Sequence, residues 1–250
     1  MDGTMTAETV RLAGHGGDEI EAYLARPGGD TTRGGVVVIH HLPGYDRWIK
    51  EVARRFAADL GYDAICPNLY SREAPGADPA DAAATVRAQG GVPDERLIGD
   101  VAGAAAHLRS LPTSNGKVGV IGHCSGGRQS VLAACHLDLD AAVDCYGAYV
   151  TGTPSPQFPM KVTNLVDQLP NLRCPVLGLF GNEDQFPSPE QVDEFEQIVK
   201  DHAKPYEFHR YDGAGHAFFA PDRPSYRVEA ANDGWERIAD FYGTYLGGRG

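Results

Sequence analysis

The stretch that decides the fold is residues 117–127, which read KVGVIGHCSGG. The apolar, β-branched run at its start predicts a buried strand, and the small residues that follow Gly126 predict a helix. Between them lies Gly-His-Cys-Ser-Gly, the pattern of a sharp strand-to-helix turn that carries a nucleophile at its centre, here Cys124. We expect glycine at 122 and 126 because a Cβ atom at either position would collide with backbone in so tight a turn.

The position of Cys124 at the start of a helix favours a reactive thiolate. Peptide N–H groups and the partial positive charge of the helix stabilise an anion there. Moving the pattern by one residue, to make Ser125 the nucleophile, would put His123 where a small residue is needed. On this turn alone, a buried structural cysteine explains the pattern equally well.

Two further residues complete a catalytic triad in the order nucleophile, acid, histidine, which is typical of one large class of hydrolases. Asp184 follows Cys124 just past a predicted strand, and His216 comes later in the glycine-flanked loop 213–218. Either residue alone has an ordinary explanation, since turn aspartates often cap backbone and single histidines are often exposed. Together and in this order, they favour a catalytic role.

Strand and helix patterns alternate along the rest of the chain. Such alternation predicts an α/β fold in which a mostly parallel central sheet is covered by helices on both faces. Strands are predicted over residues 19–26, 35–40, 63–66, 117–121, 139–146, 175–180 and 206–211. Helices are predicted over residues 48–60, 93–110, 126–134, 189–201 and 225–246.

Two stretches rich in proline, glycine and small residues interrupt this alternation, residues 71–80 and 151–159. Both follow predicted strands, and open α/β sheets bind ligands beyond the carboxyl ends of their strands. We therefore expect loops that shape a pocket rather than linkers, and a single domain over residues 1–250. Whether residues 151–159 close over the pocket as a lid is left open.

Charge and hydropathy exclude several classes of protein. The 250 residues include 22 Lys and Arg against 34 Asp and Glu, a net charge of −12, which repels nucleic acid and anionic lipid surfaces. The longest strongly apolar run, residues 36–39, is far too short to cross a bilayer, and the first residues do not resemble a signal peptide. We expect neither nucleic-acid nor membrane binding.

The five cysteines indicate a reducing compartment. Their number is odd, and no two of them have the spacing of a zinc site. We therefore expect a cytoplasmic protein with free thiols and without a metal or another cofactor.

With these motifs in place, the sequence resembles the dienelactone hydrolases, the cysteine branch of the α/β-hydrolase fold. The resemblance runs from about residue 34 to the C-terminus. It includes three motifs besides the turn, at residues 114–119, 213–219 and 222–226. The resemblance implies the α/β-hydrolase fold and a triad of Cys124, Asp184 and His216. It also implies an oxyanion hole made by the backbone N–H groups of Leu42 and Ser125.

The sequence departs from the family at the positions where its characterised members activate the cysteine and bind the substrate carboxylate. They carry a glutamate that helps to ionise the cysteine, and His41 stands at that position. They hold a substrate carboxylate with a serine and an arginine, where this chain has Ala217 and Ala220. The partial loss of this anion clamp speaks against dienelactone itself as the substrate. Three other arginines are candidates to replace the clamp, although solvated surface suits each of them too: Arg72, Arg87 and Arg223.

The role of several aromatic and histidine residues stays open at this stage. As an imidazole His41 could hydrogen-bond the thiol, as an imidazolium it could stabilise the thiolate, or it could simply line the pocket. A metal site built from His40, His41, His123 and Cys124 would need all four to converge, and we expect none. Candidate pocket aromatics, some of which must belong to the core instead, are Tyr45, Trp48, Tyr70, Tyr146, Phe158 and Phe218.

The sequence thus predicts a hydrolase that cleaves a small-molecule carboxylic ester or lactone through a Cys-His-Asp triad and a thioester acyl-enzyme. The alternatives are a thioesterase or a carbon–carbon bond hydrolase on the same triad, or a non-catalytic redox-sensing or ligand-binding protein on this scaffold. Retention of His216 and Asp184 speaks against the last of these, because sensing needs no triad. A homodimer is left open.

Overall fold

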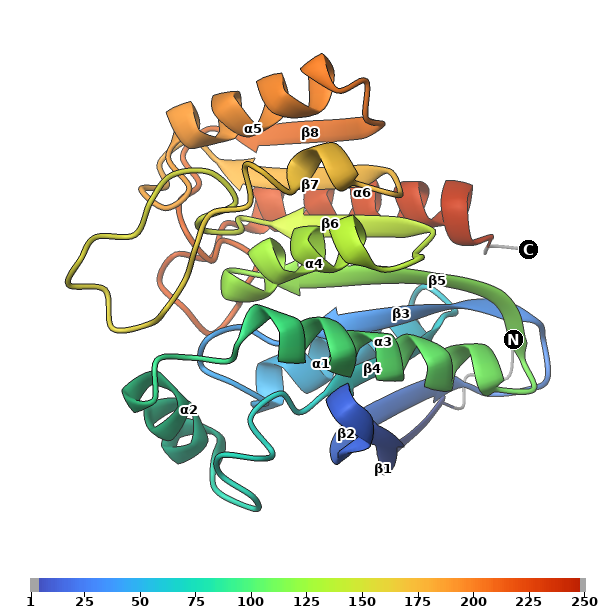
Figure 1. Ribbon diagram of the computed structural model, residues 1–250. Helices are drawn as coiled ribbons and strands as arrows, with labels where there is room; N and C mark the ends of the chain where they lie inside the picture. The colour runs from blue at the N-terminus through green and yellow to red at the C-terminus, as the bar shows by residue number, and fades with distance from the viewer. Residues whose placement is uncertain (1–4, 248–250) are drawn as a thin grey trace.

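The computed structural model describes residues 5–247. Its centre is an eight-stranded sheet with the strand order β1-β2-β4-β3-β5-β6-β7-β8 (Figure 1). The first two strands form an antiparallel edge, and β2 is also antiparallel to β4. The six strands β3 to β8 all run parallel to one another. The strands are β1 (Met5–Ala13), β2 (Glu19–Pro27), β3 (Arg33–Ile39), β4 (Asp63–Pro67), β5 (Ser114–His123), β6 (Ala141–Cys145), β7 (Val176–Gly181) and β8 (Tyr206–Tyr211).

Helices cover both faces of the sheet, so the predicted α/β class is confirmed (Figure 1). Residues of α2, α3, α4 and α5 pack into the core on one face, and residues of α1 and α6 pack into the core on the other. The helices are α1 (Arg47–Ala58), α2 (Pro79–Ala88), α3 (Asp94–Ser110), α4 (Ser125–His136), α5 (Pro189–Asp201) and α6 (Val228–Leu246), with short 3₁₀ turns at His15–Gly17 and Leu169–Asn171.

The central strand β3 shows why its sequence is apolar at every position. Val36 and Val38 pack into the core beneath α1 and α6, whereas Val37 and Ile39 pack into the core beneath α3 and α4. All four side chains are fully buried. A strand buried on both faces has no solvent side, so it reads as a continuous hydrophobic run rather than an alternating one.

Every strand and helix predicted from the sequence is present, with ends that differ by at most three residues. The prediction missed β1, because only Leu12 of its nine residues is buried and an exposed edge strand carries little hydrophobic pattern. It also missed α2, whose buried face is mostly alanine. Asp78 caps this helix, which begins at Pro79, so the last two residues of the expected loop 71–80 are helical.

The parallel strands end at one edge of the sheet, where the loops after them gather. The residues that follow β3, β5, β7 and β8 at this edge include Leu42, Cys124, Asp184 and His216, respectively. Among residues 5–247, no helix is long and apolar enough to cross a membrane. The candidate site therefore lies at the carboxyl edge of the sheet.

Candidate active site

Cys124 occupies a strained turn between β5 and α4. Its backbone has φ 57° and ψ −124°, a region that residues with a side chain rarely adopt. A Cβ atom at Gly122 would overlap the carbonyl oxygen of Gly126, and one at Gly126 would lie 2.6 Å from the carbonyl oxygen of Ile39. The N–H of Cys124 donates to the carbonyl oxygen of Cys145 at 3.0 Å, which fixes the turn to β6. The side chain is left partly exposed.

Asp184 and His216 lie together beside this turn. Oδ2 of Asp184 is 2.8 Å from Nδ1 of His216, and Oδ1 accepts the N–H of Phe186 at 2.9 Å. The carboxylate is almost fully buried, while the imidazole is half-buried. Both carboxylate oxygens are therefore engaged, and the ring is held with Nδ1 turned away from the cysteine.

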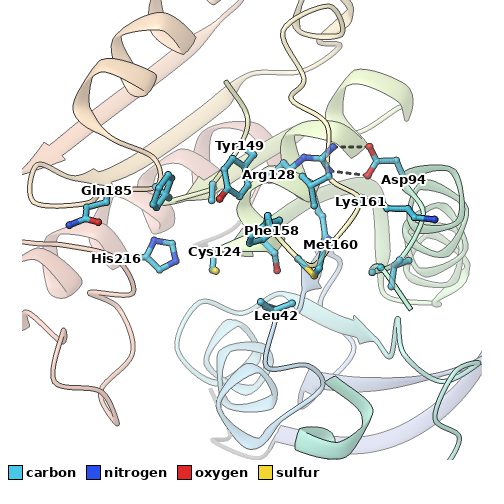
Figure 2. A pocket seen from close by; sticks show the side chains of 18 of the residues that line it. Leu42, Asp94, Cys124, Arg128, Tyr149, Phe158, Met160, Lys161, Gln185 and His216 are labelled. Carbon is cyan, nitrogen blue, oxygen red and sulfur yellow. Dashed lines mark hydrogen bonds and ion pairs between the residues drawn. The ribbon is translucent and has the colours of Figure 1, made fainter. Parts of the chain in front are cut away.

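The other side of the His216 ring faces Cys124 (Figure 2). Burial opposes ionisation of the ring, but its hydrogen bonds with Asp184 and with Cys124 and the charges of these two groups together raise the pKa of His216 to about 10. These contacts therefore favour the protonated form of the ring. Three loops that are far apart in the sequence thus bring a sulfur, an imidazole and a carboxylate next to one another.

Tyr146 supports the His216 ring from the side. The two rings meet edge to face, with their centroids 5.2 Å apart, and Tyr146 is buried with φ 45°. Its N–H donates to the carbonyl oxygen of Leu179 at 2.9 Å, which ties it to β7. Ala217, next to the histidine, also has a positive φ of 64°. Strained backbone therefore flanks both Cys124 and His216.

A cavity of about 510 Å³ opens in front of Cys124. Leu42 and Ser125, the residues expected to supply the oxyanion hole, line it together with Cys124, Asp184 and His216. Away from the sulfur its wall is mostly apolar, and Arg128 and Asp94 form a pair in the wall on the side opposite His216 (Figure 2). Besides Leu42, the apolar and aromatic side chains of the wall are Tyr70, Val92, Ala148, Tyr149, Phe158, Met160, Val162 and Phe186.

Only two of the six aromatic residues expected in the pocket line it, Tyr70 and Phe158. The other four have structural contacts. Tyr146 supports His216, Phe218 is buried in the core against Tyr146, and Trp48 packs on the rings of His41 and His123. Tyr45 is buried beneath Lys50, whose ammonium group lies 3.9 Å from the centre of the ring.

The His41 side chain contacts Asp46. Its Nε2 lies 2.7 Å from Oδ2 of Asp46, whose Oδ1 accepts the N–H of Ile49 and so caps α1. Burial acts against the Asp46 carboxylate, but the hydrogen bond from His41 holds the pKa of Asp46 below its ordinary value. The structure therefore links this imidazole to the start of α1, and its role in activating the cysteine stays a prediction.

The neighbouring histidines are buried and neutral. His40 accepts the N–H of Leu69 at Nε2 and its Nδ1 lies 3.0 Å from the carbonyl oxygen of His41; burial lowers the pKa of His40 to about 4. His123 lies among the rings of Trp48, Tyr146 and Phe219, and burial lowers its pKa to about 3. In the part of the chain that the structure describes, no group of three or more His, Cys, Asp or Glu residues is placed to hold a metal ion.

The three arginines considered as a replacement anion clamp do not line the cavity. Arg72 makes two hydrogen bonds to the buried carboxylate of Asp100, at 2.8 and 2.9 Å, and a third to Asp18. Arg87 and Arg223 are exposed. The sequence analysis missed two cationic residues of the cavity wall: Arg128, which lies in α4 four residues after Cys124, and Lys161. The only sequence signal for Arg128 was its position directly after the turn motif.

Comparison with known proteins places the chain in context. Residues 20–246 match the sequence model of the dienelactone hydrolase family. A "putative carboxymethylenebutenolidase" of Salmonella typhimurium is 34% identical over 261 residues, covering 100% of this chain and 91% of the relative. One of Escherichia coli K12 is 36% identical, covering 92% and 84%. The crystal structure of a "putative dienelactone hydrolase" from Klebsiella pneumoniae superposes with a TM-score of 0.84 at 30% identity, covering 97% of this chain and 100% of that one.

Proposed function

Because the chain belongs to the dienelactone hydrolase family, whose members hydrolyse esters and lactones, we propose that it cleaves a small-molecule carboxylic ester or lactone through a thioester on Cys124. One observation carries the proposal: the His216 ring is held by Asp184 at 2.8 Å on one side and faces Cys124 on the other, at the mouth of a cavity. In this proposal residues 1–250 act as one catalytic domain and need no cofactor.

The first half of the reaction forms the acyl-enzyme. Cys124 reacts as the thiolate, with its proton held on His216, and its sulfur attacks the carbonyl carbon of the substrate. The resulting oxyanion accepts hydrogen bonds from the N–H groups of Leu42 and Ser125, and each such donor lowers the barrier by roughly 3 kcal/mol. His216 then gives its proton to the departing alkoxide oxygen, the carbon–oxygen bond breaks, and a thioester remains.

The second half releases the acid. The neutral His216 takes a proton from water, the hydroxide adds to the thioester carbonyl, and the carbon–sulfur bond breaks to return the Cys124 thiolate. Asp184 keeps the ring in the correct tautomer and stabilises the imidazolium in both halves. An amide substrate is disfavoured, because the tetrahedral adduct would expel the thiolate more readily than an amine.

Family membership favours this hydrolytic role over the redox-sensing alternative. Thioester and carbon–carbon substrates would use the same triad and stay as predictions. All five cysteines are free thiols, which fits the cytoplasmic location that we propose with it.

The test is hydrolysis of p-nitrophenyl hexanoate by the wild type and by Cys124→Ala. We expect kcat/KM to fall at least about a thousandfold in the variant, with its circular dichroism unchanged. The matched control is Cys174→Ala, which removes a buried thiol just before β7, at the opposite end of that strand from Asp184, and should retain activity. Undiminished turnover in Cys124→Ala would refute the proposal.

A further inference from the structure

Arg128 and Asp94 form a charged pair in the cavity wall. Nη1 and Nη2 of Arg128 lie 2.9 and 2.7 Å from the two carboxylate oxygens of Asp94, a bidentate pair. Nε and Nη2 also donate to the carbonyl oxygen of Thr163, at 3.1 and 2.7 Å. Arg128 is buried, so this guanidinium has little access to water. Its charge is cancelled within the protein, and most of its donors are already used.

Lys161, the other lysine or arginine of the cavity wall, does not supply the positive charge that Arg128 has lost to Asp94. The aliphatic stem of Lys161 lies over Gly90, and its ammonium end points away from Cys124 (Figure 2). The residue is exposed, so water and salt screen its charge. At the His216 end, the exposed Glu183 adds a further negative charge. Among the lining residues within 5–247, no unpaired cation points into the space between Cys124 and the Arg128–Asp94 pair.

The order of groups along the cavity says which part of a substrate enters that space. His216 lies on one side of Cys124, and the Arg128–Asp94 pair lies on the other (Figure 2). His216 has to protonate the leaving alkoxide, so the leaving group lies on the histidine side. The acyl group therefore extends the other way, past Phe158 and Met160, toward the charged pair.

The wall in this direction suits an uncharged acyl group. Apolar side chains surround the path from the sulfur, including Val92, Phe158, Met160 and Val162. A carboxylate carried at the far end of the acyl group would lose its water there and would meet Asp94 beside an arginine that is already neutralised. A hydrocarbon end would gain from burial instead.

We propose that Asp94 is a specificity-determining residue: by neutralising Arg128 it makes the cavity select esters and lactones with an uncharged apolar acyl group over those with an anionic one. This inference rests on the proposed function, because it assumes that the acyl group is carried by Cys124. Asp94 acts through the charge of Arg128 and takes no part in bond making or breaking.

The test compares two p-nitrophenyl esters with acyl chains of the same length, the hexanoate and the half ester of adipic acid, which ends in a carboxylate. For the wild type we expect kcat/KM to favour the hexanoate at least about tenfold. In Asp94→Asn the guanidinium charge is left uncompensated, so this ratio should fall about tenfold, chiefly through the KM of the adipate half ester. In Arg128→Gln the unpaired carboxylate remains, so the ratio should rise.

Asp233→Asn is the matched control, because Asp233 pairs with the partly exposed Arg237 in α6, neither residue lines the cavity, and the loss of this pair should leave the ratio unchanged. A wild type that accepts both esters equally or prefers the adipate half ester would overturn the inference, even with an acyl adduct on Cys124. So would an unchanged ratio in folded Asp94→Asn. If neither ester is hydrolysed in a Cys124-dependent way, the proposed function fails and this inference fails with it. If a variant does not fold, the ratio of kcat/KM for the two esters in the wild type alone tests the inference.

Discussion

The cavity holds two ion pairs, one on each side of Cys124. At one end, Nδ1 of His216 lies 2.8 Å from Asp184; at the other, Nη2 of Arg128 lies 2.7 Å from Asp94. The distances are alike, but the chemistry is not, because an imidazole can release its proton in the accessible pH range and a guanidinium cannot. The first pair can therefore move protons, whereas the second can only shape and charge the wall.

The backbone conformation also differs around the two pairs. Cys124, Tyr146 and Ala217 have positive φ values near the first pair. Arg128 and Asp94 lie instead within regular helices, α4 and α3. Tyr149 of the cavity wall also has a positive φ, so strained backbone is not confined to the His216 end, but the Arg128–Asp94 pair itself is carried by regular helices.

The largest effect should come from breaking the proton-moving pair. His216→Ala removes both the proton donor to the leaving group and the base that activates water, so kcat/KM for p-nitrophenyl hexanoate should fall at least about a thousandfold. His209→Ala is the control, because His209 lies on β8 and pairs with Glu207. Its activity should change by less than about twofold, as expected of a surface pair. Equal losses in both variants would argue that the effect is structural.

Breaking the fixed pair should affect stability more than chemistry. Arg128→Met leaves Asp94 and the carbonyl oxygen of Thr163 without their donors, and we expect a loss of about 2 kcal/mol in the free energy of unfolding. Arg237→Met removes the exposed partner of Asp233 and should cost less than about 1 kcal/mol. Urea unfolding of both variants measures the difference. Equal costs would mean that burial of Arg128 adds nothing to its pair.

The proton-moving pair should also show itself in the pH dependence of stability. The pKa of His216 is raised to about 10 in the folded protein from an ordinary value near 6.5, so the folded state binds the proton more tightly. Its stabilising contribution is complete below pH 6.5 and is lost as the pH rises toward 10. Relative to His216→Gln, the wild type should therefore lose stability in urea unfolding between pH 7 and pH 9.5. A difference that does not change with pH would contradict the raised pKa.

The smallest effect concerns the ring that supports His216. The buried hydroxyl of Tyr146 has no hydrogen-bond partner among the described residues, so Tyr146→Phe should change the free energy of unfolding by no more than about 1 kcal/mol, or stabilise the fold. Tyr242→Phe is the matched comparison, since its buried hydroxyl donates to the carbonyl oxygen of Val120 at 2.8 Å. That variant should be destabilised by about 1 kcal/mol. Thermal denaturation of both variants would test this, and a larger loss in Tyr146→Phe would reveal a partner for its hydroxyl.

The two ends of the cavity also differ in how far the sequence predicted them. The turn at Cys124 has a recognisable local pattern: a Cβ atom at Gly122 would overlap Gly126 four residues later, although the contact that requires Gly126 is made with Ile39 of the neighbouring strand β3. Asp184 and His216 each follow a strand, and parallel strands deliver the loops after them to one edge, so their proximity follows from the order of elements. This part of the site could be placed before the structure was known.

The end that carries the Arg128–Asp94 pair could not be predicted in this way. Arg128 and Asp94 lie in different helices, and nothing local marks them as partners. The aromatic residues posed the same difficulty, since Trp48 and Phe158 are both large aromatic side chains, yet the first packs on His41 and His123 while the second lines the cavity. Whether a large apolar side chain fills the core or faces a cavity depends on contacts made across the whole fold.

The most direct test of the central claim is intact-protein mass spectrometry of the enzyme quenched within its first turnover of p-nitrophenyl hexanoate, followed by peptide mapping. We predict a mass gain of one hexanoyl group on the peptide that contains Cys124, accumulating further in His216→Ala if deacylation slows more than acylation. Hydrolysis that continues while the acyl group is found on another residue, or on none, would contradict the account.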